Sequence, residues 1–154
     1  MFREMRRKDR ELRNDDIIEI LKNNEYGILS TISENGYPYG VPLSYIYMND
    51  SIYFHSALDG HKLDNIKISD KVSFCVVGET SVVPDEFTTN YESVIILGKA
   101  KEIFDDEKTS VLLEILKKYS KEYIEKGKIY IEKAGQRTKV FKIDINHISG
   151  KKRS

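Results

Sequence analysis

Apolar and polar residues alternate along several short stretches of the chain, a pattern typical of antiparallel strands. The strands predicted from this pattern are residues 26–32, 37–48, 51–57, 71–78, 92–103 and 138–148. Asn35-Gly36 and Asn49-Asp50 separate the first three strands, and such pairs indicate tight hairpin turns. Residues 79–91, which contain Pro84, are predicted to be irregular.

Helical spacing of apolar residues occurs between and beside these strands. One helix is predicted to begin at Asn14-Asp15-Asp16 and to end at Asn23-Asn24, and a short one to run from about residue 60 to 68. Leu112, Ile115, Leu116 and Tyr119 form a stripe on a third, which begins at Asp105, and residues 121–134 are predicted as a further helical or looser piece. Strands in consecutive hairpins predict a mainly β (α+β) fold, a six-stranded antiparallel barrel with peripheral helices in one domain, 1–154.

Two stretches are candidates for binding. Pro38 and Pro42 cannot donate to a ladder, so residues 41–44 are predicted to lie on an edge or at a bulge, with backbone groups free for a ligand. The strand 53–57 breaks at Asp59-Gly60 and leads into a helix with an early Lys62. This arrangement predicts an anion cradle, because helix N-termini and a lysine both attract phosphate. The alternative is an ordinary strand–loop–helix junction with a solvated lysine.

The charge of the chain is balanced overall, with 25 Lys and Arg against 25 Asp and Glu, which does not favour nucleic acid or a membrane surface as partner. Residues 1–13 form a basic N-terminal arm, in which Arg3, Arg6, Arg7, Lys8, Arg10 and Arg13 outnumber Glu4, Asp9 and Glu11. No apolar run predicts a membrane span or a signal peptide. A single Cys75 excludes an internal disulfide, and a cytoplasmic protein is expected.

Several common site chemistries lack their signatures. His55, His61 and His147 have no ligand spacing, so no metal site is predicted. Neither a G-x-S-x-G motif nor an exposed cysteine indicates a nucleophile, and Cys75 is expected to be buried in a strand. G-x-G-x-x-G and Walker-type loops are also absent. The remaining stretches, 41–45, 55–62 and 88–93, suit a flat cofactor lying across strands.

The order of five segments resembles a known family. They are Gly36-Tyr37-Pro38, Val41-Pro42-Leu43-Ser44-Tyr45, Tyr53-Phe54-His55-Ser56-Ala57 with Gly60-His61-Lys62, Val72-Ser73-Phe74, and Tyr91-Glu92-Ser93-Val94 with Gly98. The chain is similar to the FMN-binding split-barrel proteins related to pyridoxamine 5′-phosphate oxidase, and most similar to the nitroimidazole-resistance (Nim-type) branch. The N-terminal Met5-Arg6-Arg7-Lys8-Asp9-Arg10 also resembles that branch.

The resemblance implies a six-stranded split barrel, a homodimer and FMN at its interface. Val41, Pro42, Leu43 and Ser44 would contact the flavin ring. His55, Ser56 and Ala57 would flank the ring or the ribityl chain, and His61 and Lys62 would hold the phosphate. Tyr91 and Ser93 would approach from the strand that faces the partner subunit.

Two departures from the family pattern bear on activity. The oxidase proper uses arginines on the FMN phosphate, whereas this chain has none between Arg13 and Arg137. The arginine-bearing C-terminal segment that binds the pyridoxal ring is also missing, so pyridoxamine oxidation is not expected.

The leading hypothesis is a flavin-dependent reductase or oxidase of a small molecule, with nitroimidazoles among the candidate substrates and NAD(P)H or another compound as electron donor. His55 is the candidate catalytic residue, because an imidazole can donate a proton near neutral pH. A structural hydrogen bond is the alternative role of His55. The alternative function is a non-catalytic module that binds FMN or another flat cofactor, such as haem or deazaflavin, and a third is a structural dimer with an empty pocket.

Overall fold

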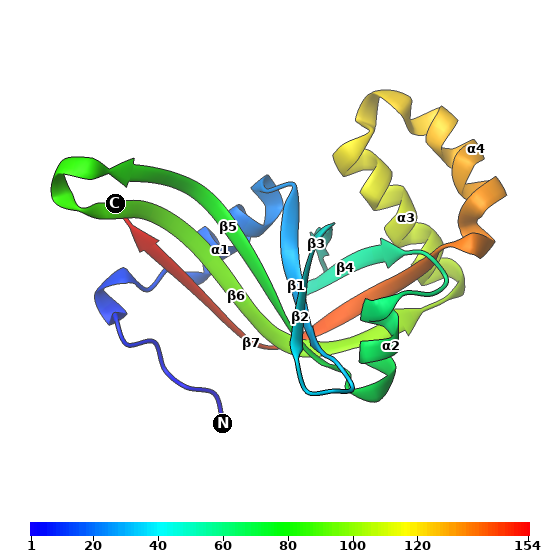
Figure 1. The fold of residues 1–154 in the computed structure, drawn as a ribbon. Helices are drawn as coiled ribbons and strands as arrows, with labels where there is room; N and C mark the ends of the chain where they lie inside the picture. Colours follow the sequence, from blue (N-terminus) through cyan, green and yellow to red (C-terminus); the bar gives the residue numbers. More distant parts are fainter.

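The computed structural model describes residues 1–154, and it combines one large antiparallel sheet with four α-helices (Figure 1). The α-helices are α1 (Asn14–Asn23), α2 (His61–Ile68), α3 (Asp105–Tyr119) and α4 (Ile124–Ala134). The strands are β1 (Tyr26–Ile32), β2 (Pro38–Ser44), β3 (Ile46–Met48), β4 (Ser51–Ser56), β5 (Lys71–Val83), β6 (Thr88–Ile103) and β7 (Lys139–Arg153). Short 3₁₀ turns lie at Lys8–Arg10, Pro84–Glu86, Lys121–Tyr123 and Gly135–Arg137.

The sheet has seven strands in the order β2-β1-β5-β6-β7-β4-β3. The predicted count of six strands is therefore wrong, because Tyr45 divides the expected strand 37–48 into two strands at opposite edges of the sheet. Only this one residue separates β2 from β3, so the sheet has to curl until its two edges approach one another. No ladder joins β2 to β3, and the sheet is not closed.

The first two hairpins are confirmed, as is the tight turn predicted at Asn49-Asp50, but the turn at Asn35-Gly36 differs from the prediction. Ile32 pairs with Pro38, so the β1–β2 loop has five residues and only Gly36 has a positive φ, of 86°. The predicted tight turn between β3 and β4 has two left-handed residues, since Asn49 and Asp50 have φ of 52° and 55° and Met48 pairs with Ser51. A two-residue turn of this kind matches the twist of the strands that it joins.

The prediction of an irregular segment at 79–91 is wrong. A bulge between Val77 and Thr80 shifts the register, after which β5 and β6 pair again from Thr80–Tyr91 to Val83–Thr88. Phe87, with a φ of 54°, completes the turn at the tip of this hairpin. The hairpin projects beyond the body of the protein (Figure 1), and its Val82 and Phe87 are exposed.

The main core lies on the inner face of the curled sheet. α1 contributes Ile17, Ile20 and Leu21 to it, and α2 contributes Leu63 and Ile66. A second cluster beneath α3 joins Val111 and Leu112 to strands β3, β4, β6 and β7. The other residues of the main cluster are Leu29, Tyr45, Ile52, Phe54, Val72, Phe74, Val76, Val94, Ile96, Ala100, Phe141 and Ile143.

The N-terminal arm lies against the outer face of the sheet, on the side opposite the core. Leu12 N–H donates to the Gly150 carbonyl at 2.9 Å, and Glu11 forms a β-bridge with Lys151. Farther out, the ring of Phe2 stacks on His147 with 4.9 Å between centroids. The backbone bonds at residues 11 and 12 therefore hold the arm to the end of β7.

Candidate functional site

Strand β2 presents open backbone at an edge of the sheet. Pro42 and Ser44 are exposed, whereas Val41 and Leu43 are partly buried and pack against the core. In a strand, every second residue directs its backbone N–H and C=O to the same side, so residues 38, 40, 42 and 44 behave alike. Proline has no N–H and is tolerated where these groups point away from the neighbouring strand, as at Pro38 and Pro42. The N–H groups of Gly40 and Ser44 then point the same way. The expected edge at 41–44 is confirmed.

The end of strand β4 places His55, Ser56 and Ala57 beside β7. His55 pairs with Val140 and is exposed, whereas Ser56 is buried and donates its hydroxyl proton to the Ala57 carbonyl at 2.8 Å. Ser56 Oγ is therefore engaged within the chain, while the His55 ring and the backbone after it remain accessible.

Helix α2 begins directly after this strand. Gly60 has a φ of 148°, which favours glycine, and its carbonyl accepts from the N–H groups of Leu63 and Asp64, both at 3.1 Å. The N–H groups of His61 and Lys62 precede these bonds and have no acceptor in the helix. Lys62 makes no ion pair, and its charge is close enough to affect the titration of His55.

His61 is engaged in packing rather than left free at the helix start. Its ring lies 4.0 Å from that of Tyr39, and its Nε2 lies 3.0 Å from Ser33 Oγ. The buried Asn65 donates to Thr31 Oγ1 at 2.9 Å and to Ser33 Oγ at 3.3 Å. These contacts fasten α2 to the β1–β2 hairpin, so β2 and the first turn of α2 lie together.

A hollow of about 500 Å³ adjoins these contacts. Ser33, Tyr39, His61, Asp64 and Asn65 are among the residues that line it. Sequence reasoning identified His61 but missed the others, because no local pattern marks a serine or an asparagine as the partner of a residue about 30 positions away.

A second group that the sequence did not reveal secures the junction between β2 and β3. Lys118 Nζ donates to the Tyr45 carbonyl at 2.9 Å and lies 3.9 Å above the Tyr45 ring. The Tyr119 hydroxyl accepts from Tyr45 N–H at 3.0 Å and lies 2.5 Å from the Glu25 carbonyl oxygen. Burial lowers the pKa of Lys118 to about 8. The end of α3 therefore fixes the backbone that follows Ser44.

Tyr91 and Ser93 lie elsewhere in the chain. Both lie on the outer face of β6, where Tyr91 pairs with Arg153 and Ser93 pairs with Lys151 of β7. This part of the sheet is near the β5–β6 hairpin, whereas α2 lies toward the other end of the sheet (Figure 1). Within one chain the fold packs His61 against Tyr39 of β2 and brings Lys62 close enough to act on His55, and it leaves Tyr91 and Ser93 apart from them.

The titration of His55 gives a direct check on this geometry. Partial burial, the larger cause, and the charge of Lys62 both lower the pKa of His55 below 6.5. A histidine with a depressed pKa makes the fold lose stability as the pH falls through the unfolded value of about 6.5.

We therefore expect a His55 pKa below 6.5 by NMR titration of the flavin-free protein. Lys62→Ala should raise the pKa, whereas Lys67→Ala, at the other end of α2, should leave it unchanged. A wild-type pKa above 6.5 would contradict the described surroundings of His55.

Comparisons with known proteins agree on the fold. A family model described as pyridoxamine 5′-phosphate oxidase matches residues 13–152. The search of curated proteins found no match. Several solved structures share the fold at low sequence identity.

One of these structures, from Bacteroides thetaiotaomicron, is provisionally described as a 5-nitroimidazole antibiotic resistance protein. Its sequence is 22% identical to this chain, and the two structures superpose with a TM-score of 0.74. The match covers 92% of this chain and 85% of the Bacteroides protein. A protein described as FAD-binding, from Mesorhizobium loti, is 23% identical with a TM-score of 0.64, covering 94% and 98%. A haem storage protein from Vibrio cholerae is 13% identical with a TM-score of 0.68, covering 90% and 94%.

Proposed function

The chain belongs to the pyridoxamine 5′-phosphate oxidase family, and from this premise we propose that it binds FMN and uses it to oxidise or reduce a small molecule. The ring would lie along the open edge of β2, and the phosphate would lie at the start of α2. The observation that carries the proposal is the meeting of Lys62, two free helix amides and the exposed edge strand in one region.

The phosphate end is supported by charge and by backbone geometry. Lys62 has no carboxylate partner, and the amides of His61 and Lys62 lie at the positive end of α2. His61 packs on Tyr39 and bonds to Ser33, so its side chain supports the helix start, and its backbone N–H is the group available to an anion.

The ring end is supported by the chemistry of the edge strand. A flavin ring carries carbonyl and ring-nitrogen acceptors and an N–H donor along one edge, and the outward backbone groups of Gly40, Pro42 and Ser44 offer both kinds of partner. The residues present therefore fit a flat ring with polar edges.

When bound, the flavin supplies the transfer of electrons or hydride. This chain would bind and orient it, and His55 would hold a proton at its imidazole next to the reacting region. A pKa below 6.5 leaves His55 mostly neutral at pH 7, with one ring N–H that can donate a hydrogen bond and one ring nitrogen that can accept a proton.

The proposed assembly is a homodimer in which the partner subunit's Tyr91 and Ser93 complete the site. The outer sheet face carries the apolar Ile32, Val77 and Ile95, each about half exposed, on strands β1, β5 and β6. A second copy placed there would cover these residues and bring its own β6 toward the flavin.

FMN should then stabilise the dimer by linkage, because a ligand held by two subunits binds the dimer in preference to the monomer. Sedimentation at decreasing protein concentration is expected to give a dimer that persists to lower concentration with FMN than without it. A monomer that still holds FMN would contradict the interface placement.

Equilibrium titration of the full chain with FMN, followed by quenching of flavin fluorescence, tests the proposed function. Saturable binding and oxidation of NAD(P)H with an added acceptor, such as a nitroimidazole, would support an enzyme. Binding without turnover would support the alternative of a non-catalytic binding module.

A further inference from the structure

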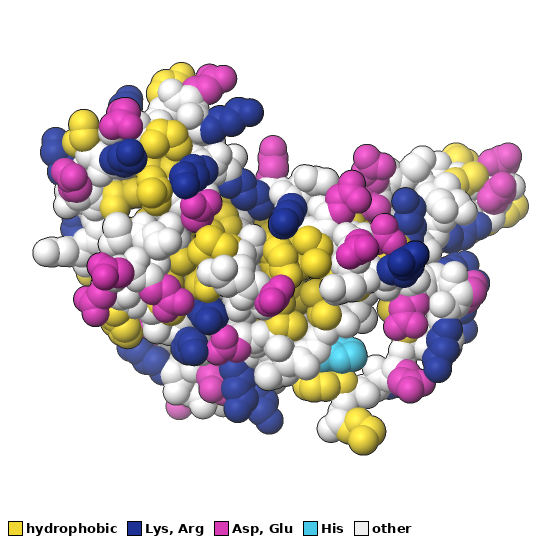
Figure 2. Space-filling view, turned by 180° about the vertical axis from the view of Figure 1, so that it is seen from behind, with side chains coloured by type: hydrophobic (Ala, Val, Ile, Leu, Met, Phe, Trp, Pro, Cys, Tyr) yellow, Lys and Arg dark blue, Asp and Glu magenta, His cyan; other side chains and the backbone are white.

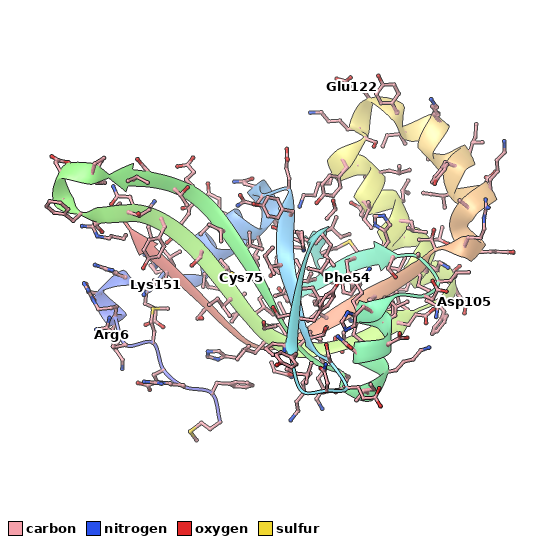
Figure 3. The ribbon with its side chains drawn as sticks, viewed as in Figure 1. Arg6, Phe54, Cys75, Asp105, Glu122 and Lys151 are labelled. Carbon is pink, nitrogen blue, oxygen red and sulfur yellow. The ribbon has the colours of Figure 1, made fainter.

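A group of basic side chains on the outer face of the sheet converges on one tyrosine. Tyr91 lies on β6, Lys151 lies on the neighbouring β7, and Arg10 comes from the N-terminal arm. The β-bridge between Glu11 and Lys151 places Arg10 beside the strand end. All three side chains are half-buried. Figure 3 shows Lys151 near the arm, on the part of the sheet that lies beside it.

The two cations of this group differ from their neighbours in having no carboxylate partner. Arg7 pairs with Asp9 at 2.6 Å, Lys8 with Glu4 at 2.8 Å, Lys152 with Glu92 at 3.8 Å and Arg153 with Glu86 at 3.7 Å. Arg10 and Lys151 form no ion pair. Their charges are therefore available to an external anion.

The hydroxyl of Tyr91 lies where both cations act on it. Lys151 Nζ is 5.8 Å from the centre of the Tyr91 ring, and the charges of Lys151 and Arg10 both act on the hydroxyl. Burial, the largest single cause, raises the pKa of Tyr91, but the two cations together outweigh it and lower the pKa below the ordinary value of a tyrosine. The surroundings thus favour negative charge on an oxygen at this position.

Of the three residues, Lys151 lines a hollow of about 420 Å³, which provides room for a ligand. Lys151, Ser93 and Ser149 lie on its sheet side, and Arg3 and Lys8 border it from the arm. Two acids also line it, of which Glu4 is paired with Lys8 and Glu11 is unpaired. Glu11 therefore opposes an anion and reduces its affinity.

We propose that Arg10, Tyr91 and Lys151 form an anion-binding site for the phosphate group of a small phosphorylated molecule. Arg10 and Lys151 contribute the charge, and the Tyr91 hydroxyl turns its proton toward the bound oxygen. The phosphate belongs either to the flavin of a second copy or to a separate ligand. The site stands on these contacts and does not depend on where this chain binds its own flavin.

The test is titration of the isotope-labelled, full-length protein with inorganic phosphate, following the amide signals of residues 91, 93, 149 and 151 by NMR. Saturable shifts are expected, and Lys151→Gln should weaken binding by about tenfold, the size of one charge-assisted hydrogen bond at a half-exposed site. Glu11→Gln should tighten binding by about two- to threefold.

Lys128→Gln is the matched control, since Lys128 pairs with Glu125 on α4, far from the arm along the chain, and should leave the affinity unchanged. If Lys151→Gln fails to fold, the same phosphate titration is made with Arg10→Gln, a substitution on the N-terminal arm. Absence of saturable shifts, or equal affinities in the Lys151 and Lys128 variants, overturns the proposal.

Repeating the phosphate titration with FMN present distinguishes the phosphate of a second copy's flavin from that of a separate ligand. Competition between FMN and phosphate at these signals would support the phosphate of a flavin held by a second copy. Binding of phosphate alongside FMN would support a separate phosphorylated ligand. Both results support the site itself.

Discussion

Replacing Lys62 with alanine is expected to weaken FMN binding by about 1.5–3 kcal/mol, or about 10- to 150-fold in dissociation constant. Lys62 is the one cation at the start of α2, and no carboxylate of the chain neutralises it. No arginine is present between Arg13 and Arg137 to replace it. Its loss would leave only backbone amides on the phosphate.

The control for this prediction compares two ligands and two lysines. Riboflavin lacks the phosphate, so its affinity should change little in the Lys62→Ala protein. Lys67→Ala, in the last turn of the same helix, should bind FMN as the wild type does. An FMN dissociation constant that Lys62→Ala leaves unchanged would place the phosphate elsewhere.

Replacing Tyr45 with alanine is expected to lower the free energy of unfolding by about 3–5 kcal/mol, as for other large aromatic residues in cores. Tyr45 is fully buried, its ring packs edge-on to Phe74 with centroids 5.1 Å apart, and its hydroxyl donates to the Leu21 carbonyl at 2.6 Å. The alanine would leave a cavity where the two edges of the sheet approach.

Tyr45→Phe separates packing from hydrogen bonding. It keeps the ring but leaves the Leu21 carbonyl without its donor, so a loss of about 1–2 kcal/mol is expected. Urea unfolding of both variants measures these values. Equal losses would contradict the view that ring packing dominates at this position.

Elements with strong local signals were predicted well from the sequence. The acids at the start of α1 and the Gly60 before α2 mark helix starts within a few residues. The turn type at Asn35-Gly36 was predicted wrongly, because a two-residue turn requires its flanking residues to pair directly. Ile32 pairs with Pro38 instead, which leaves a longer loop.

The largest error in the fold concerns 79–91, where Pro84 indicated irregular backbone. The two strands of the hairpin nevertheless pair, from Thr80 opposite Tyr91 to Val83 opposite Thr88, and this pairing overrides the local preference. Strand β7 likewise continues to Arg153, because β6 offers it partners as far as Tyr91. Sequence patterns within one segment do not reveal the partner strand, so both extensions were missed.

The candidate site was predicted in part for the same reason. The open edge at β2 follows from its prolines, and the helix start at Lys62 follows from Gly60. The packing of His61 on Tyr39 and the approach of Lys151 to the Tyr91 ring depend on residues brought together by the tertiary fold. Neither contact has a local signal.

The central claim, that the chain binds FMN at the β2 edge and the start of α2, is tested most directly by the absorbance spectrum of the purified protein, with chromatography of the ligand released on denaturation. Flavin bands and the release of FMN are expected. A colourless protein that also fails to bind added FMN would contradict it.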